Sequence, residues 1–176
     1  MRVALAALLG ACWLFAGCVS AGGGVGDALS AWRSGRTGAA LERASAEYAR
    51  FRDGNGLTEA AVRAAAADLR KTLSETPLPP AVAASADRSP HARPGVLAQE
   101  LRADLLSGEV TATARAIGVV AGLELRARAP ELLAIVYRRD PIRAAGRLMA
   151  GASVALRSVT VKRLALDALE RLQRRP

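Results

Sequence analysis

Apolar residues recur at spacings of three and four along most of the chain after residue 36. The series Leu41, Ala44, Tyr48 and Phe51 is one example. Such spacings place apolar side chains on one face of an α-helix, which has 3.6 residues per turn. The apolar residues are mainly Ala, Leu and Val, and only 3% of the chain is aromatic, which favours close-packed helices over a β-sandwich or barrel. The sequence therefore predicts an all-α fold.

Turn signals divide the chain into an N-terminal and a C-terminal helical region. We expect residues 27–75 to form an antiparallel helical hairpin, because Asp53-Gly54-Asn55-Gly56 ends one helix and Thr58 can cap the next. Residues 76–95 hold five prolines, which predicts a linker rather than a helix or strand. Residues 96–176 are expected to form a bundle of four or five helices.

Three segments of the C-terminal region carry more specific predictions. Residues 132–137 are an apolar run that fits either a helix or a buried strand. Asp140-Pro141 looks like a helix N-cap followed by proline at the first helical position. Ser153 is expected to be a helix cap, and residues 160–174 are expected to form the last helix.

A faint repeat links two stretches that lie 49 residues apart. Val110-Thr111 corresponds to Val159-Thr160, and the apolar positions of 116–123 correspond to those of 165–172. The stretch 161–169 resembles the second helix of HEAT-type repeats, in which helix pairs recur at about 40–47 residues. This resemblance covers at most residues 96–176 and implies stacked helix pairs. A generic helical bundle is the alternative, because any two Ala/Leu-rich amphipathic helices show similar spacings.

The first eighteen residues have the parts of a secretory signal. Arg2 precedes an apolar run from Val3 to Phe15, and the small residues Ala16-Gly17 lead to Cys18. The run is shorter than the about 20 apolar residues that a bilayer span needs. We therefore expect residues 1–17 to be a cleaved signal peptide.

The end of this segment, Leu14-Phe15-Ala16-Gly17-Cys18, resembles the lipobox of bacterial lipoproteins, although that family usually has Leu where Phe15 stands. The resemblance implies that Cys18 is multiply acylated, for example with palmitate, and that residues 18–26 are a lipidated, Gly-rich tether. Val19 is not Asp, which favours the outer membrane, facing the periplasm, in a Gram-negative organism. Alternatives are the second match ending at Cys12, an ordinary signal, or an uncleaved anchor.

No pattern of catalytic or metal-binding residues is apparent. His91 is the only histidine and lies among the prolines of the linker, so neither a zinc site nor a Ser-His-Asp triad is expected. Four acids precede an arginine by four residues, as in Glu59–Arg63 and Asp167–Arg171, which is typical of solvated helix faces. We expect no enzyme activity, no metal, and no cofactor beyond the covalent lipid at Cys18.

Positive charge is concentrated in the last third of the chain. The formal net charge is +9, and residues 124–176 hold twelve bases against five acids. If several arginines share a face, they would attract anionic lipid headgroups, wall polymers or an acidic protein. The candidate anion- or partner-binding residues are Arg126, Arg128, Arg138, Arg139, Arg143 and Arg147. A solvated Arg-rich surface that reflects a GC-rich genome is the alternative.

Two functions follow from these features. The first is a lipid-anchored envelope protein with a non-catalytic scaffold role that binds another envelope protein. The alternative is a protein that binds anionic envelope surfaces through its basic C-terminal third. Nucleic acid is not an expected partner, because of the export signal and because no aromatic platform accompanies the bases. The sequence does not predict an oligomeric state.

Overall fold

A computed structural model of the chain describes residues 24–75, 101–144 and 149–174. In these ranges the chain is helical, with no β-strand, which confirms the all-α prediction. The elements are α1 (Val25–Arg33), α2 (Thr37–Gly54), α3 (Glu59–Glu75), α6 (Val110–Gly122), the 3-10 helix η1 (Arg126–Arg128), α7 (Ala129–Tyr137) and α8 (Val154–Arg174). Residues 101–106 are also helical.

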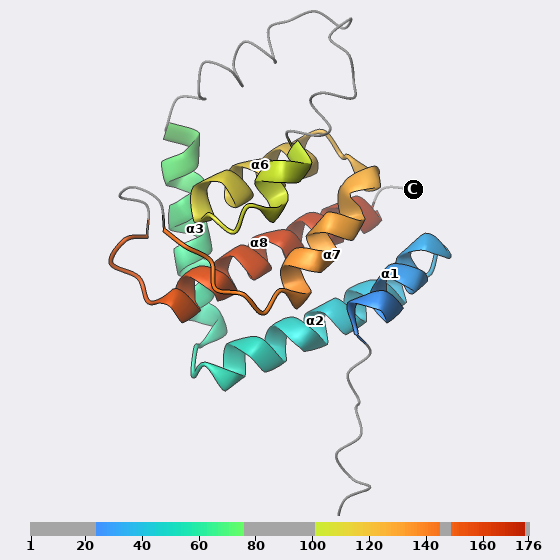
Figure 1. Cartoon of the computed structure of the whole chain (residues 1–176), viewed down its shortest axis with the longest axis horizontal. Helices are drawn as coiled ribbons and strands as arrows, with labels where there is room; N and C mark the ends of the chain where they lie inside the picture. Colours follow the sequence, from blue (N-terminus) through green and yellow to red (C-terminus); the bar gives the residue numbers. More distant parts are fainter. Residues whose placement is uncertain (1–23, 76–100, 145–148, 175–176) are drawn as a thin grey trace, which may run out of the picture.

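Helix α8 lies at the centre of the bundle, and α2, α3, α6 and α7 all pack against it (Figure 1). Its residues 158–162 are all buried in succession, so α8 is enclosed on every side over this stretch, whereas Arg163, Asp167 and Glu170 further along are only partly buried. A buried helix must satisfy its polar side chains internally. Ser158 Oγ accepts a hydrogen bond from Ile142 N at 3.2 Å, and Thr160 Oγ1 donates to Leu156 O at 2.7 Å.

The turn between α2 and α3 forms as predicted, but the two helices do not form an antiparallel hairpin. Thr58 Oγ1 accepts a hydrogen bond from Ala61 N at 3.2 Å, and Gly56 adopts a φ of +66° that favours glycine. Beyond the turn, α2 and α3 diverge steeply and hardly touch, while α2 packs along α1 (Figure 1). The predicted arrangement was wrong because the apolar stripes of both helices pack on α8 instead of on each other.

The described helices share one hydrophobic core. Tyr48 of α2 and Val62 of α3 belong to the same buried cluster as Leu133 of α7 and Leu169 of α8. The predicted division into a hairpin and a separate C-terminal block is therefore not a division of the core. The turn signals could not reveal this, because contacts of α2 and α3 with α8 join residues 97 and 115 positions apart, as in Arg70–Asp167 and Tyr48–Arg163.

The two stretches of the faint repeat have different structural roles. Helix α6 ends at Gly122, whereas α8 continues to Arg174. As a result Leu123 is 60% exposed, while the corresponding Leu172 is 2% exposed. The described helices form a bundle around α8, and the HEAT-like resemblance of residues 96–176 stays a prediction.

The segment after α7 differs from the prediction. Residues 132–137 are helical, but Asp140-Pro141 does not begin a further helix. Instead the chain is extended: Arg143 N donates to Gly108 O, and Val110 N donates to Arg143 O, both at 2.9 Å. Ile142, which is 1% exposed, is buried against the core by this path. Burial of Ile142 and these long-range hydrogen bonds outweigh the local capping preference.

Ser153 caps α8 as predicted, because Leu156 N donates to its Oγ at 3.1 Å. The helix therefore begins at Val154 rather than at residue 160, where the apolar periodicity becomes regular. The additional turn carries Arg157 and Ser158, whose side chains contact the segment before the helix. The sequence thus predicted the cap and the last helix but placed its start too late.

Replacement of Leu172 by Ala is expected to lower the free energy of unfolding by about 2–5 kcal/mol, because the substitution leaves a cavity in the core. The matched substitution Leu123→Ala should change it by less than about 0.5 kcal/mol, since that side chain is mostly exposed. Urea unfolding followed by circular dichroism measures both effects. Equal losses in the two variants would contradict the different roles of α6 and α8.

Candidate functional site

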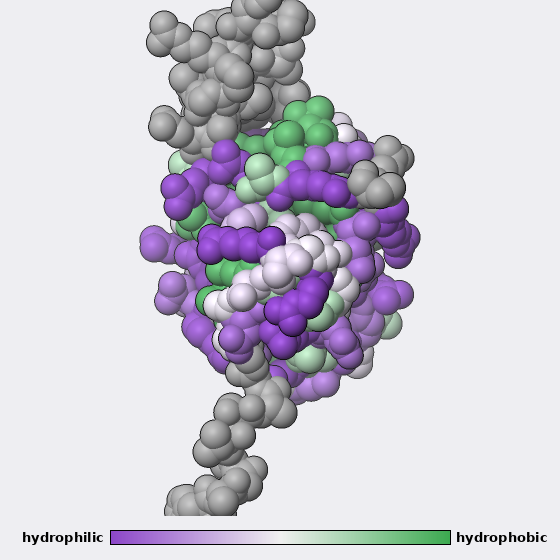
Figure 2. Space-filling model, turned by 90° about the vertical axis from the view of Figure 1, so that its right-hand side faces the viewer, coloured by the Kyte–Doolittle hydropathy of each residue, from purple (hydrophilic) through white to green (hydrophobic). Residues whose placement is uncertain are grey.

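The predicted arginines that the structure describes lie in two groups, one at each end of α7. The described ones are Arg126, Arg128, Arg138, Arg139 and Arg143. Two of them lie in η1, while the other three follow the opposite end of α7, and a helix of 9 residues separates these groups by about 13 Å. Arg147 and the predicted lipidation residue Cys18 lie outside the described residues. On the face seen in Figure 2, hydrophilic residues likewise alternate with neutral and apolar ones.

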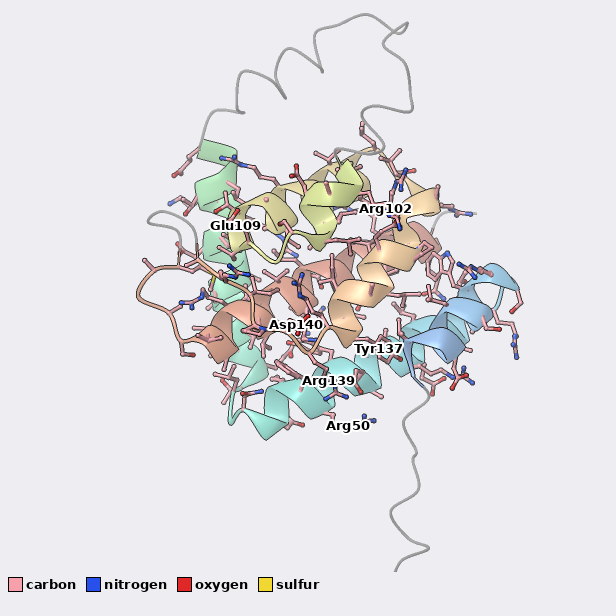
Figure 3. The ribbon with its side chains drawn as sticks, viewed as in Figure 1. Arg50, Arg102, Glu109, Tyr137, Arg139 and Asp140 are labelled. Carbon is pink, nitrogen blue, oxygen red and sulfur yellow. The ribbon has the colours of Figure 1, made fainter. Side chains whose placement is uncertain are left out.

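Carboxylates of the protein already pair with two of these arginines. Arg128 Nη1 lies 3.2 Å from Glu131 Oε1, and Arg139 Nη2 lies 3.0 Å from Glu47 Oε1. The Glu47 side chain is nearly buried and also accepts a hydrogen bond from Arg50 Nη1 at 2.6 Å. Arg139 and Arg50 accordingly lie on the same side of α2 in Figure 3. These ion pairs connect elements of the bundle and leave little free charge for a ligand.

Arg138 is used to close the turn before α6. Gly108 has a φ of +75°, and a Cβ there would collide with the Arg138 guanidinium. Arg138 Nη1 donates to Leu106 O at 3.2 Å in the same turn. This arginine therefore joins the end of α7 to the segment that precedes α6.

Two basic residues of α8 hold neighbouring backbone in the same way. Arg157 Nη1 donates to Ala152 O at 2.5 Å, and Lys162 Nζ donates to Val136 O at 2.5 Å and to Arg138 O at 2.6 Å. The Lys162 ammonium thus binds carbonyl groups at the C-terminal end of α7, where the helix dipole is negative. Part of the basic excess of the last third therefore serves the fold.

Lys162 is buried, with 2% exposure, and its Nζ lies 4.4 Å from the centre of the Phe51 ring. Burial lowers the pKa of Lys162 to about 8, the Glu47 carboxylate acts against this shift, and Arg139 and Arg138 add to it. The sequence did not single out this residue. The only available signal was its position directly after Val161, which the periodicity places on the inner face of the last helix.

A second polar cluster joins α2, α3 and α8 around Glu59. Its carboxylate accepts hydrogen bonds from Tyr48 Oη at 2.8 Å, Arg52 Nη1 at 2.6 Å and Arg63 Nε at 2.8 Å, and Arg163 Nη1 lies 3.5 Å away. Partial burial would raise the pKa of Glu59, but the hydrogen bonds and the charge of Arg163 prevail and lower it to about 2. Burial and the same carboxylate raise the pKa of Tyr48.

A groove of about 420 Å³ lies between α3, α6 and α8. Leu73 of α3, Ile117 of α6 and Leu164 of α8 contribute its larger apolar side chains, and small residues line much of the remainder. A Cβ added at Gly118 would meet no atom within 4 Å, so the groove is open beside this glycine. Arg171 also lines the groove and has no ion-pair partner among the described residues.

A basic basin of about 280 Å³ adjoins this groove, and Arg70 and Asp167 line both. Arg63, Ala66 and Arg163 complete the basin. Asp167 pairs with Arg70 and, at 2.6 Å between Oδ1 and Nη2, with Arg163. The basin is thus lined by three arginines and one carboxylate, and Glu59, outside this lining, also pairs with Arg63 and lies 3.5 Å from Arg163. We refer to the groove and the basin together as the α3–α6–α8 site.

Comparison of the chain with protein-family models, curated proteins and solved structures gives no match. None of the helices in the described ranges is long and apolar enough to cross a membrane. Over the same residues, no group of three or more His, Cys, Asp or Glu side chains is placed to hold a metal ion. The α3–α6–α8 site is therefore identified by its own geometry.

Sequence reasoning did not find this site, because its residues come from three helices that are distant along the chain. The pair Glu59–Arg63 forms as its four-residue spacing predicts, with 2.8 Å between Oε1 and Nε. The expected pair Asp167–Arg171 does not form, since Asp167 turns to Arg70 and Arg163 instead. Arg163 lies four residues before Asp167 on α8, and the packing of α3 on α8 brings Arg70 to the same carboxylate.

Glu59→Gln is expected to lower the free energy of unfolding at pH 7 by about 1–3 kcal/mol, because the surrounding arginines lose their carboxylate. The folded-state pKa of Glu59 lies below the ordinary 4.5, so its stabilisation is present above pH 4.5 and is lost as the pH falls towards 2. Urea unfolding at pH 7, 4.5, 3 and 2 measures this effect. As the pH falls, the free energy of unfolding should decrease less in this variant than in the unmodified chain.

The exposed Glu42 of the same bundle supplies the control for this experiment. Glu42→Gln removes one carboxylate without disturbing the Glu59 cluster, so its acid dependence should follow that of the unmodified chain. If the free energy of unfolding decreased equally with falling pH in Glu59→Gln and in the unmodified chain, the role assigned to Glu59 would be contradicted.

Proposed function

We propose that this chain is an exported, lipid-anchored protein of a bacterial envelope, whose helical bundle has a non-catalytic binding role. Two features support the proposal at different levels. The segment 1–18, with its apolar run and lipobox-like end at Cys18, supports export and anchoring. The α3–α6–α8 site supports binding, and it is the structural observation on which the functional conclusion depends.

The chemistry of the site favours binding over catalysis. Its lining residues are aliphatic side chains, small residues and arginines, with Asp167 as the one carboxylate among those described. A general base must be free to take a proton from a reactant. Asp167 is instead held by ion pairs with Arg70 and Arg163.

The position of the site is compatible with an anchored protein. Helix α1, the first described element, packs on α2 and α7, whereas the site lies between α3, α6 and α8 (Figure 1). The seven residues 18–24 can extend over at most about 25 Å between the lipid and the start of α1. The bundle would therefore stay close to the membrane surface. The α3–α6–α8 site would lie on a different side of the bundle from the tether.

The alternative function, binding of anionic surfaces through the basic C-terminal third, has weaker support. A surface binder needs several uncompensated charges on one face. The described candidates lie at both ends of α7, and Arg128 and Arg139 are paired with carboxylates. The arginines that do gather in one place belong to the α3–α6–α8 site, where an apolar groove accompanies them.

The anchor is tested by the intact mass of the protein extracted from membranes. We expect a chain that begins at Cys18 and carries the additional mass of acyl groups. Cys18→Ser should abolish this mass, whereas Cys12→Ser, a cysteine of the expected signal peptide, should leave it unchanged. An unmodified chain would contradict the lipid anchor, and an acyl group that depends on Cys12 would move the cleavage site.

A further inference from the structure

We infer that the α3–α6–α8 site binds a single-chain anionic amphiphile, namely one acyl chain that ends in a carboxylate. The acyl chain would occupy the apolar groove and the carboxylate would lie in the basic basin. This inference rests on the binding role proposed above and names its ligand class. It does not depend on the lipid at Cys18.

The groove has the size and lining that a flexible hydrocarbon chain requires. Its volume of about 420 Å³ falls in the range of small-molecule sites, which is about 300–1,000 Å³. Leu73, Ile117 and Leu164 offer aliphatic contact from three helices, and Gly118 leaves space beside them. Each CH₂ group that is removed from water adds to the affinity, so a chain of several carbons gains substantial affinity there.

The basin supplies the complementary charge for the head group. Arg70 is half exposed in its side chain and lies on the boundary between basin and groove. A guanidinium group binds a carboxylate through two parallel hydrogen bonds, which an ammonium group cannot reproduce. Arg63 and Arg163 form the other walls of the basin, where Glu59 balances part of their charge, so Arg70 is the main head-group contact.

Asp167 occupies the place of the ligand carboxylate in the structure described here. It pairs with Arg70 and Arg163, which neutralises part of the basin and holds both guanidinium groups in position. A bound carboxylate would compete with Asp167 for these arginines. Removal of its charge by Asp167→Asn should therefore strengthen binding, whereas removal of Arg70 should weaken it.

Other ligand classes fit the site less well. A stable protein partner typically covers about 800 Å² on each side, which exceeds what one groove of this volume offers. An anionic wall polymer would match the basin but has no hydrocarbon chain for the groove. The combination of both environments, joined at Arg70, favours an amphiphile.

The test is photo-crosslinking with a decanoate that carries a diazirine on its alkyl chain. The probe is added to the full chain in phosphatidylcholine nanodiscs, and labelled residues are mapped by mass spectrometry. We expect labels in α3, α6 and α8, at least a tenfold decrease with excess unlabelled decanoate, and little labelling by the matching trimethylammonium probe. Arg70→Gln should lower labelling about tenfold, and Asp167→Asn should raise it.

Gly118→Leu tests the groove without weakening the helix, because leucine has the higher helix propensity and open space surrounds this position. It should decrease labelling at least fivefold while the midpoint of thermal unfolding is unchanged or higher. Gly26→Leu, at an exposed helical glycine of α1 that is equally open, and Arg33→Gln, at an exposed arginine of α1, are the matched controls and should leave labelling unchanged.

Three outcomes would overturn the inference. They are labelling that spreads over all helices, labelling that Gly118→Leu leaves intact, and equally strong labelling by the cationic probe. None of these outcomes affects the intact-mass measurement at Cys18, so a failure of this inference is distinguishable from a failure of the anchor. A specific protein partner captured in place of the fatty acid would also overturn it, while it would support the broader binding role.

Discussion

The enclosure of α8 is the constraint on which the rest of this structure depends. The helices α2, α3, α6 and α7 bury this 21-residue helix. The packing of α6 and α7 on α8 is the most extensive in the bundle, together with that of α1 on α2. Small residues such as Ala165 and Ala168 permit this close approach from several directions. With few aromatic side chains to fill a core, the chain obtains its packing from a central helix whose residues 158–162 are buried in succession.

Enclosure of α8 also determines how the basic residues are used. A positively charged side chain on a buried helix must find acceptors inside the protein, and Lys162 finds them at the carbonyl groups that end α7. Arg157 does the same at Ala152. A high content of arginine is therefore not by itself evidence of a nucleic-acid or membrane surface, because guanidinium groups also satisfy carbonyl groups and carboxylates within a fold.

The binding site arises where this enclosure is incomplete. Helices α3 and α6 both pack on α8 but touch each other only slightly, and the groove is the space that they leave above it. The side chains that α8 directs there change from the apolar Leu164 to Asp167, which pairs with Arg70 and Arg163. One helix thus supplies an apolar surface and a charged one to adjacent parts of the same site, which is the arrangement that an amphiphilic ligand requires.

The sequence by itself determined the secondary structure and its local signals. The apolar periodicity of α2, the cap at Thr58, the break at Gly108 and the cap at Ser153 all depend on residues within one or two turns, so they were predictable. Only the tertiary structure decided that α2 and α3 pack on α8 and that Arg70 pairs with Asp167. It also decided that the chain around Ile142 is extended, where a helix was predicted. These outcomes depend on contacts between residues that are distant along the chain, such as Arg70 and Asp167 or Tyr48 and Arg163, which periodicity and turn chemistry do not encode.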